Sequence, residues 1–202
     1  DGRMSHEVEL LFKVHGVLLA LDERAAERVR ASGCAHCGGR LHVSNYPRKA
    51  RGLSAEGETA GAYEKRLSLC CGRDGCRHRA TPPSVRFLGR KVYAALTILL
   101  VSASGEAETC APPVIATTPG APSWATRRRY RFWWAVEFFQ TPWFVEMAGR
   151  FAEPVVAVDA PASLLKRFVG SLSERITGLL RLVSPLTTRS VAPEASRVAM
   201  GM

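Results

Sequence analysis

Two pairs of cysteines between residues 34 and 76 constrain the fold of this chain more than any other feature. Cys34 and Cys37 form a C-x-x-C pair, Cys71 and Cys76 form a C-x4-C pair, and glycines lie next to both pairs. Two such pairs can place four thiolates tetrahedrally around one Zn²⁺. Glycines allow the positive φ angles that a tight turn around a metal requires. The pattern therefore predicts a structural zinc site.

The same cysteines could instead form two disulfides or a redox-active pair. Disulfide scaffolds are typical of short secreted domains, whereas this chain has 202 residues and no recognisable signal sequence. A thioredoxin-like pair lies near a βαβ pattern, and the sequence offers no such pattern. Zinc is the preferred interpretation, and the reduced thiols that it needs favour a cytoplasmic location.

Cys70 and Cys71 are adjacent, and we expect only one of them to bind the metal. If residues 66–71 form a strand, alternate side chains face the same side, so Cys71 shares a face with Leu69. We therefore assign Cys71 as the third ligand. Two histidines near the cysteines could substitute as ligands, but we expect a basic, exposed role for both: His36 and His78.

The formal net charge of +10 favours a polyanionic partner. Most of the positive residues are arginines, which bind phosphate bidentately and can recognise guanine edges. The longest apolar stretch, residues 92–103, is too short to span a bilayer. We therefore expect nucleic acid, and no membrane, as the partner.

The sequence predicts an α+β fold in which a small zinc-ribbon β-hairpin module is embedded in a mostly α-helical chain. Five segments are expected: an N-terminal helical segment (1–32), the zinc ribbon (33–83), a helical region like a helix-turn-helix (84–151), a C-terminal amphipathic helix (152–185) and a mobile tail (186–202). In the first segment, Asp22 is expected to cap a second helix that Gly33 terminates.

Within the ribbon, alternating polar and apolar residues predict strands over 40–44, 65–70 and 77–81. If residues 91–101 form a helix, nearly every face of it is apolar, which predicts that the helix is buried. Basic residues gather on and after the ribbon, where we expect them to contact phosphates: Arg48, Lys49, Arg77, Arg79, Arg86 and Arg90.

A second basic segment begins near residue 123. Ser123 is expected to cap a helix in which Arg127, Arg128 and Arg131 share a face. Such a helix could enter the major groove of DNA and recognise bases. The alternative is an aromatic core helix with an exposed cationic face, and the sequence leaves both interpretations open.

Part of the chain resembles the amino-terminal zinc ribbons of insertion-sequence transposases and their accessory proteins. The resemblance rests on Cys34-Ala-His-Cys37-Gly-Gly-Arg-Leu, Leu69-Cys-Cys71, Gly75-Cys76-Arg77-His-Arg79 and Thr81-Pro-Pro-Ser-Val-Arg-Phe87, and it covers residues 33–135. It implies a ribbon whose Arg-rich strand leads into a helix-turn-helix that binds duplex DNA. We find no room after this part for the RNase H-like catalytic domain of a transposase, with its three separated carboxylates. The resemblance thus implies DNA binding without strand transfer.

Apolar residues in the last helical segment alternate spacings of four and three, as in the seam of a short coiled coil. They are Leu165, Val169, Leu172, Ile176, Leu179 and Val183. The stripe could form a homodimer through residues 161–184, or it could pack inside the chain.

The preferred function is that of a zinc-dependent, non-catalytic DNA-binding protein. A zinc-stabilised RNA-binding module and a protein-interaction scaffold are the alternatives. We expect no enzymatic activity, because the sequence shows no nucleophile–base pairing, phosphate-binding loop or open metal site.

Overall fold

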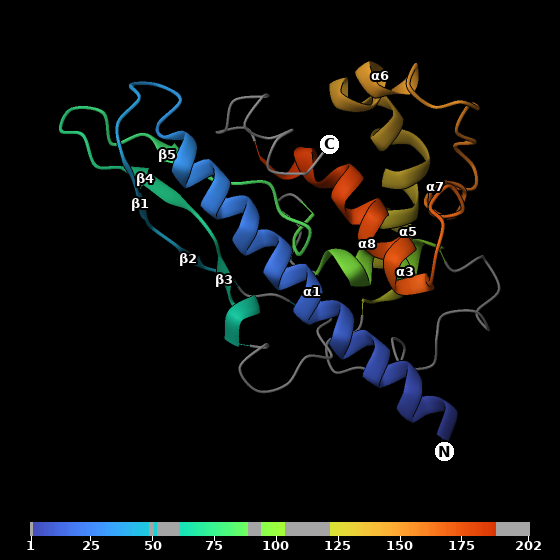
Figure 1. Ribbon diagram of the computed structural model, residues 1–202. Coiled ribbons are helices and arrows are strands. Elements are labelled where there is room, and N and C mark those ends of the chain that lie inside the picture. Colours follow the sequence, from blue (N-terminus) through green and yellow to red (C-terminus); the bar gives the residue numbers. More distant parts are fainter. Residues whose placement is uncertain (1, 49–50, 52–60, 89–93, 104–121, 189–202) are drawn as a thin grey trace.

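The computed structural model describes residues 2–48, 51, 61–88, 94–103 and 122–188 (Figure 1). The tail that was predicted to be mobile lies outside these ranges from residue 189 onward. Helices predominate and accompany a small antiparallel sheet, so the predicted α+β class is confirmed. In chain order the elements are α1 (Gly2–Ser32), β1 (Leu41–Val43), β2 (Tyr46–Pro47), β3 (Lys65–Arg66), β4 (Leu69–Cys71), β5 (Arg79–Ala80), α3 (Ala95–Ala103), α5 (Trp124–Phe132), the π-helical turn η1 (Trp133–Glu137), the 3₁₀ turn η2 (Phe138–Gln140), α6 (Pro142–Ala148), α7 (Ala162–Leu165), α8 (Leu172–Val183) and the 3₁₀ turn η3 (Ser184–Thr187). Within the described part of the chain, no helix has both the length and the apolar character that a membrane span requires.

Helix α1 is one continuous helix that extends past the helical part of the molecule to the sheet (Figure 1). The prediction that Asp22 caps a second helix is therefore wrong. Its side chain is buried and forms an ion pair with Arg86 instead of capping a helix. Gly33 has a φ of 77° directly after the last helical residue, so the helix ends where glycine was expected to end it.

The ribbon contains two small antiparallel sheets. In the larger sheet β4 lies between β1 and β5, with Leu41 opposite Cys71 and Leu69 opposite Ala80. The second sheet pairs β2 with β3. The strand predicted over residues 65–70 is thus divided between the two sheets, because β3 and β4 pair with different strands. Val29 of α1 packs against the buried side chains of the larger sheet.

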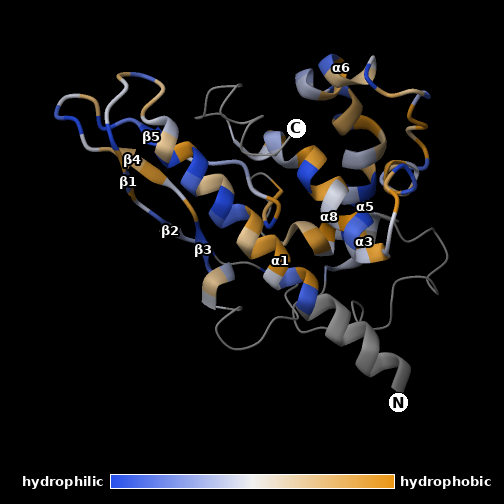
Figure 2. Ribbon diagram, viewed as in Figure 1, coloured by the Kyte–Doolittle hydropathy of each residue, from blue (hydrophilic) through white to orange (hydrophobic). Residues whose placement is uncertain are grey.

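The main core lies where α1, α3, α5 and α8 meet. Figure 2 shows apolar residues on α3, on α8 and on the adjoining part of α1. The predicted apolar helix begins at Ala95, and Ile98 and Leu99 are fully buried within it; residues 91–93 of that prediction lie outside the described chain. Trp134 and Phe138 add aromatic rings to the same core, with their centroids 5.0 Å apart.

The C-terminal segment is not the single helix that was predicted over residues 152–185. Gly170 adopts a φ of 102°, which separates α7 from α8. Ser171 then starts α8 with a capping box that includes Glu174. In the predicted stripe, Val169 is 93% and Leu172 43% exposed. The other stripe residues of α8 pack inside the chain, as in the intramolecular alternative: Ile176, Leu179 and Val183.

Candidate metal centre

The first cysteine pair lies in the turn that follows α1. The Cys34 backbone N–H donates to the carbonyl of Gly39, and the Gly38 N–H donates to the carbonyl of Cys34. Gly33 and Gly38 both have positive φ, which side chains other than glycine adopt only with strain. The turn therefore folds back on itself and directs both cysteines to its inner side.

The second pair lies at the end of β4 and in the turn that follows. The Cys76 N–H donates to the carbonyl of Arg73, and the Arg73 N–H donates to the Cys71 sulfur at 3.5 Å. The Gly72 N–H donates to the carbonyl of Arg40. Because this last bond and the pairing of β1 with β4 join the two turns, the sheet fixes one cysteine pair against the other.

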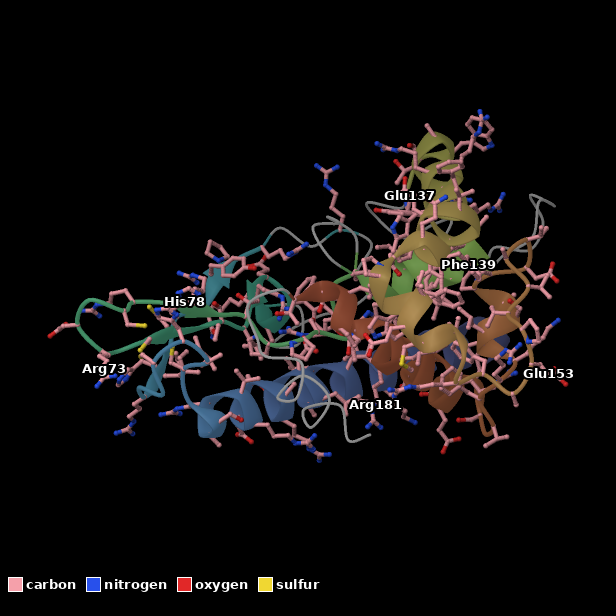
Figure 3. The ribbon with its side chains drawn as sticks, turned by 90° about the horizontal axis from the view of Figure 1, so that it is seen from above. Arg73, His78, Glu137, Phe139, Glu153 and Arg181 are labelled. Carbon is pink, nitrogen blue, oxygen red and sulfur yellow. The ribbon has the colours of Figure 1, made fainter. Side chains whose placement is uncertain are left out.

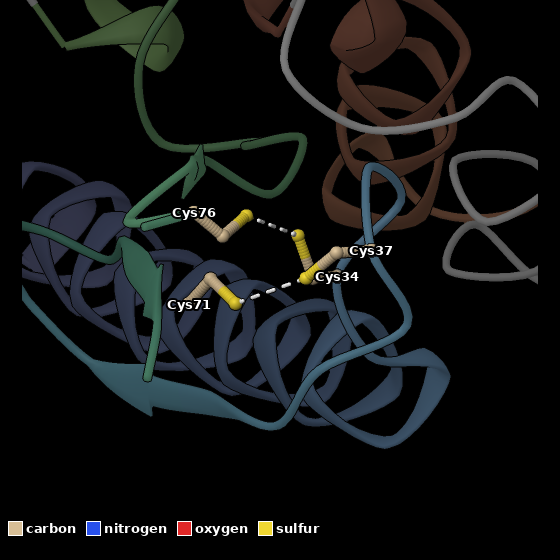
Figure 4. A group of neighbouring side chains, drawn as sticks. All are labelled: Cys34, Cys37, Cys71 and Cys76. Carbon is tan, nitrogen blue, oxygen red and sulfur yellow. Dashed lines mark hydrogen bonds between the residues drawn. The ribbon is translucent and has the colours of Figure 1, made fainter. Parts of the chain in front are cut away.

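The four predicted cysteines come together in one cluster (Figure 4). The sulfur atoms of Cys34, Cys37, Cys71 and Cys76 all lie within 4.8 Å of one another. The Cys34 and Cys76 sulfurs are 3.8 Å apart, and those of Cys37 and Cys71 are 3.5 Å apart. Four sulfurs at the usual Zn–S distance in a tetrahedron are about 3.8 Å apart. The cluster thus has the size and donor set that a metal ion such as zinc requires.

Of the two adjacent cysteines, the structure places Cys71 in the cluster. Its side chain is buried on the same face of β4 as Leu69. The sulfur of Cys70 lies instead 3.4 Å from the carbonyl oxygen of Arg77. The two histidines near the cysteines stack on each other outside the cluster, with ring centroids 5.1 Å apart: His36 and His78.

Hydrogen bonds around the cluster give the thiols of Cys37 and Cys76 different pKa values. A hydrogen bond from the Gly39 backbone N–H and a weaker effect of the Cys76 thiol lower the pKa of Cys37 to about 6. At Cys76, a backbone hydrogen bond from His78 favours the thiolate, but the neighbouring Cys37 sulfur and burial outweigh it and raise the pKa to about 12. The Cys37 thiolate is therefore stabilised by the Gly39 N–H and by the proton that the Cys76 thiol retains. A metal ion would displace the thiol protons, so its affinity should fall as the pH falls.

Gly39 lies directly against the sulfur atoms. A Cβ at this position would be 3.0 Å from the Cys71 sulfur and 3.2 Å from the Cys37 sulfur. We expect Gly39→Ala to push the sulfurs apart and to weaken zinc affinity about 10-fold, the scale of changes in residues that orient metal ligands. Competition with a chromophoric chelator measures this. Gly61→Ala is the control, because nothing lies within 4 Å of its Cβ position; equal affinities of the two variants would contradict the steric role of Gly39.

The ribbon that carries the cluster exposes three arginines: Arg73, Arg77 and Arg79. Arg79 donates to the Ser44 carbonyl and to the Ser68 hydroxyl, both at 3.0 Å. Arg77 forms an exposed ion pair with Asp74. Arg73 was not among the predicted binding residues, although its position between Cys71 and Cys76 marks it in the sequence; it is exposed and donates to the carbonyl of Cys37 at 3.0 Å.

Of the other four basic residues predicted near the ribbon, the structure describes two, and neither is exposed. The prediction that Arg86 contacts phosphate is wrong, because its side chain is 1% exposed and its Nε donates to Asp22 at 2.8 Å. Arg48 is half-buried, with its guanidinium 5.0 Å from the ring centroid of Phe87. Lys49 and Arg90 lie outside the described residues.

Helix α5 begins as predicted, with the Ser123 hydroxyl accepting from the Thr126 backbone N–H. Of its predicted base-reading residues, Arg128 is exposed, whereas Arg127 and Arg131 are half-buried. Residues 104–121, which lie between α3 and α5, are outside the described residues, so the helix-turn-helix stays a prediction. Figure 3 shows Arg73 and His78 at one end of the molecule and Glu137 in the helical part. The two predicted groups of arginines are therefore not brought together.

A scan against models of protein families and searches of the curated proteins and of the solved structures found no match to this chain.

Proposed function

We propose that the protein binds Zn²⁺ through Cys34, Cys37, Cys71 and Cys76, and that the zinc-stabilised ribbon binds nucleic acid without catalysing a reaction. Duplex DNA is the partner that we expect. The observation that carries the proposal is a closed four-cysteine cluster in a ribbon that exposes Arg73, Arg77 and Arg79.

The donor set supports a structural zinc ion. Structural zinc sites use four protein ligands, often all cysteines, whereas catalytic sites leave one position for water or substrate. The strands of the ribbon are two or three residues long, and its buried cluster is small. Strands this short are marginal without further support. When bound, zinc would supply the cross-link that holds the two cysteine turns together.

The exposed arginines of the ribbon support a polyanionic partner. Arg73 and Arg79 are held in place by backbone and hydroxyl acceptors, so they lose little conformational entropy when they bind phosphate. In the described part of residues 33–80, acidic side chains are few: Glu64 and Asp74. The resemblance of this segment to transposase zinc ribbons favours DNA over RNA.

The test is a salt titration of DNA binding. We expect the double variant Arg77→Ala/Arg79→Ala to weaken binding to all duplex sequences alike. The slope of log K against log[salt] should fall by roughly one for each phosphate that the variant no longer binds. Fluorescence anisotropy with a labelled random duplex at several salt concentrations measures both quantities. Zinc content and circular dichroism of each variant would show that the fold is intact.

Arg150→Ala is the matched control, because Arg150 is exposed in the helical part, after α6. If the ribbon variant and the control had the same salt slope, the ribbon would not be the binding surface. Structured RNA that displaces DNA at equal concentration would shift the proposal to an RNA partner. Zinc-loaded protein that binds neither nucleic acid would overturn it.

A further inference from the structure

A row of large side chains lies exposed along α5 and η1, although these helices also contribute to the main core. Trp124 is 68% exposed, Phe132 55% and Val136 36%. Arg128 completes the row, and its guanidinium lies 5.7 Å from the centroid of the Trp124 ring. Residues four apart share a helix face, so the row forms one continuous ridge.

A groove runs beside this ridge. It has a volume of about 480 Å³ and is lined mainly by apolar atoms. The lining residues are Trp124, Ala125, Arg128, Arg129, Phe132, Trp133 and Glu137. They form two neighbouring rows with a spacing of four residues, the surface pattern into which a second helix packs.

The buried side of the same helix already has its partners. Tyr130, Trp134 and Phe138 are buried in the main core, so α5 and η1 present apolar residues on two sides. The π-helical turn accommodates this, because the Phe138 N–H donates to the carbonyl of Trp133, five residues back. Such turns are frequent at functional sites.

We propose that this groove binds an acidic amphipathic helix of a partner protein. The apolar face of that helix would cover Trp124 and Phe132, and its carboxylates would pair with Arg128 and Arg129. Charge complementarity supports this choice, since residues 124–140 contain four arginines and one acidic residue, Glu137. Tryptophan and arginine are also the residue types that contribute most to protein interfaces.

Two other occupants fit the groove less well. A second copy of the chain would bring two sets of four arginines together, and like charges in contact repel. Duplex DNA would leave Trp124 and Phe132 against phosphates and water.

The test uses a displayed library of helical peptides of about 18 residues, long enough to span roughly five helical turns. Each peptide has leucine or phenylalanine along one face and either glutamate or lysine at the flanking positions. We expect selection on the zinc-loaded full chain to enrich glutamate. The enriched peptide should bind Trp124→Ala and Phe132→Ala at least about 10-fold more weakly, as expected for central interface residues.

Charge reversal makes the test specific. The double variant Arg128→Glu/Arg129→Glu should prefer the lysine version of the enriched peptide. Val158→Ala is the matched control, because Val158 is 87% exposed and lies outside α5. This variant should bind the peptide as tightly as the unchanged chain does. All these side chains lie at the surface, and circular dichroism would verify their folding.

Several results would overturn the proposal. One is selection that is indifferent to peptide charge, and another is peptide binding that survives both aromatic substitutions. Duplex DNA that protects Trp124 from fluorescence quenching would assign the groove to nucleic acid. A dimer in sedimentation that Trp124→Ala dissociates would assign it to a second copy. None of these measurements depends on whether the ribbon binds DNA.

Discussion

Asp22→Ala should destabilise the protein by about 3–5 kcal/mol, because it leaves the Arg86 guanidinium buried without a counter-charge. Asp22 and Arg86 are 2% and 1% exposed. The Asp22 carboxylate also accepts from the Val85 N–H and from the Ser84 hydroxyl. Arg86 in turn donates to the carbonyls of Ala62 and Lys65. This ion pair and its hydrogen bonds thus join α1 to the ribbon and to residues 84–86, which follow the ribbon.

Denaturant unfolding of the zinc-loaded protein measures this effect. Glu23→Ala is the matched control, because Glu23 is the next residue of α1 and is exposed. The double variant Asp22→Leu/Arg86→Met should lose less stability than Asp22→Ala alone, since removing both charges leaves neither buried and unpaired. A decrease in stability for Asp22→Ala no larger than that of the control would contradict the ion pair's role.

Cys76→Ser should release the metal and unfold the ribbon while most of the helical part remains. Structural zinc in small domains contributes about 10–16 kcal/mol of apparent binding free energy, and that energy is also folding energy. The ribbon's buried cluster is small and shares no residue with the main core. We therefore expect amide protection to disappear in β1, β4 and β5 and to persist in α3 and α8.

Metal analysis and hydrogen exchange test this prediction together. Freshly reduced protein should contain about one zinc ion per chain, and a chelator should reproduce the effect of Cys76→Ser. Cys70→Ser is the control, because the Cys70 sulfur lies outside the cluster. Zinc that remains bound to Cys76→Ser but leaves Cys70→Ser would show that the cysteine assignment is wrong.

Local patterns in the sequence predicted much of this structure. The spacing of the cysteines and the alternation of side chains before Cys71 identified the members of the cluster. Ser123 and Gly33 marked helix ends because caps depend on bonds with near neighbours. These features involve residues close in sequence, or residues that one repeating pattern relates.

Long-range pairing was not predictable in the same way. Arg86 stands in a basic run and looks like a surface residue, but its partner lies in a helix that precedes the ribbon. Asp22 was interpreted as a helix cap because its partner Arg86 lies far away in the sequence. Gly178 shows another limit: a Cβ there would lie 2.5 Å from the ring of Phe168, a contact that depends on how the chain folds back after α7.

The unbroken course of α1 sets a fixed distance within the molecule. Val14 packs in the main core and Val29 in the ribbon's core, and fifteen residues of α-helix separate them by about 22 Å. A helix resists both stretching and twisting, so α1 is a rigid connection of fixed length between the ribbon and the helical part. A nucleic acid bound to the ribbon and a protein bound to α5 would therefore have a fixed distance and orientation relative to each other. A flexible linker in place of α1 would fix neither.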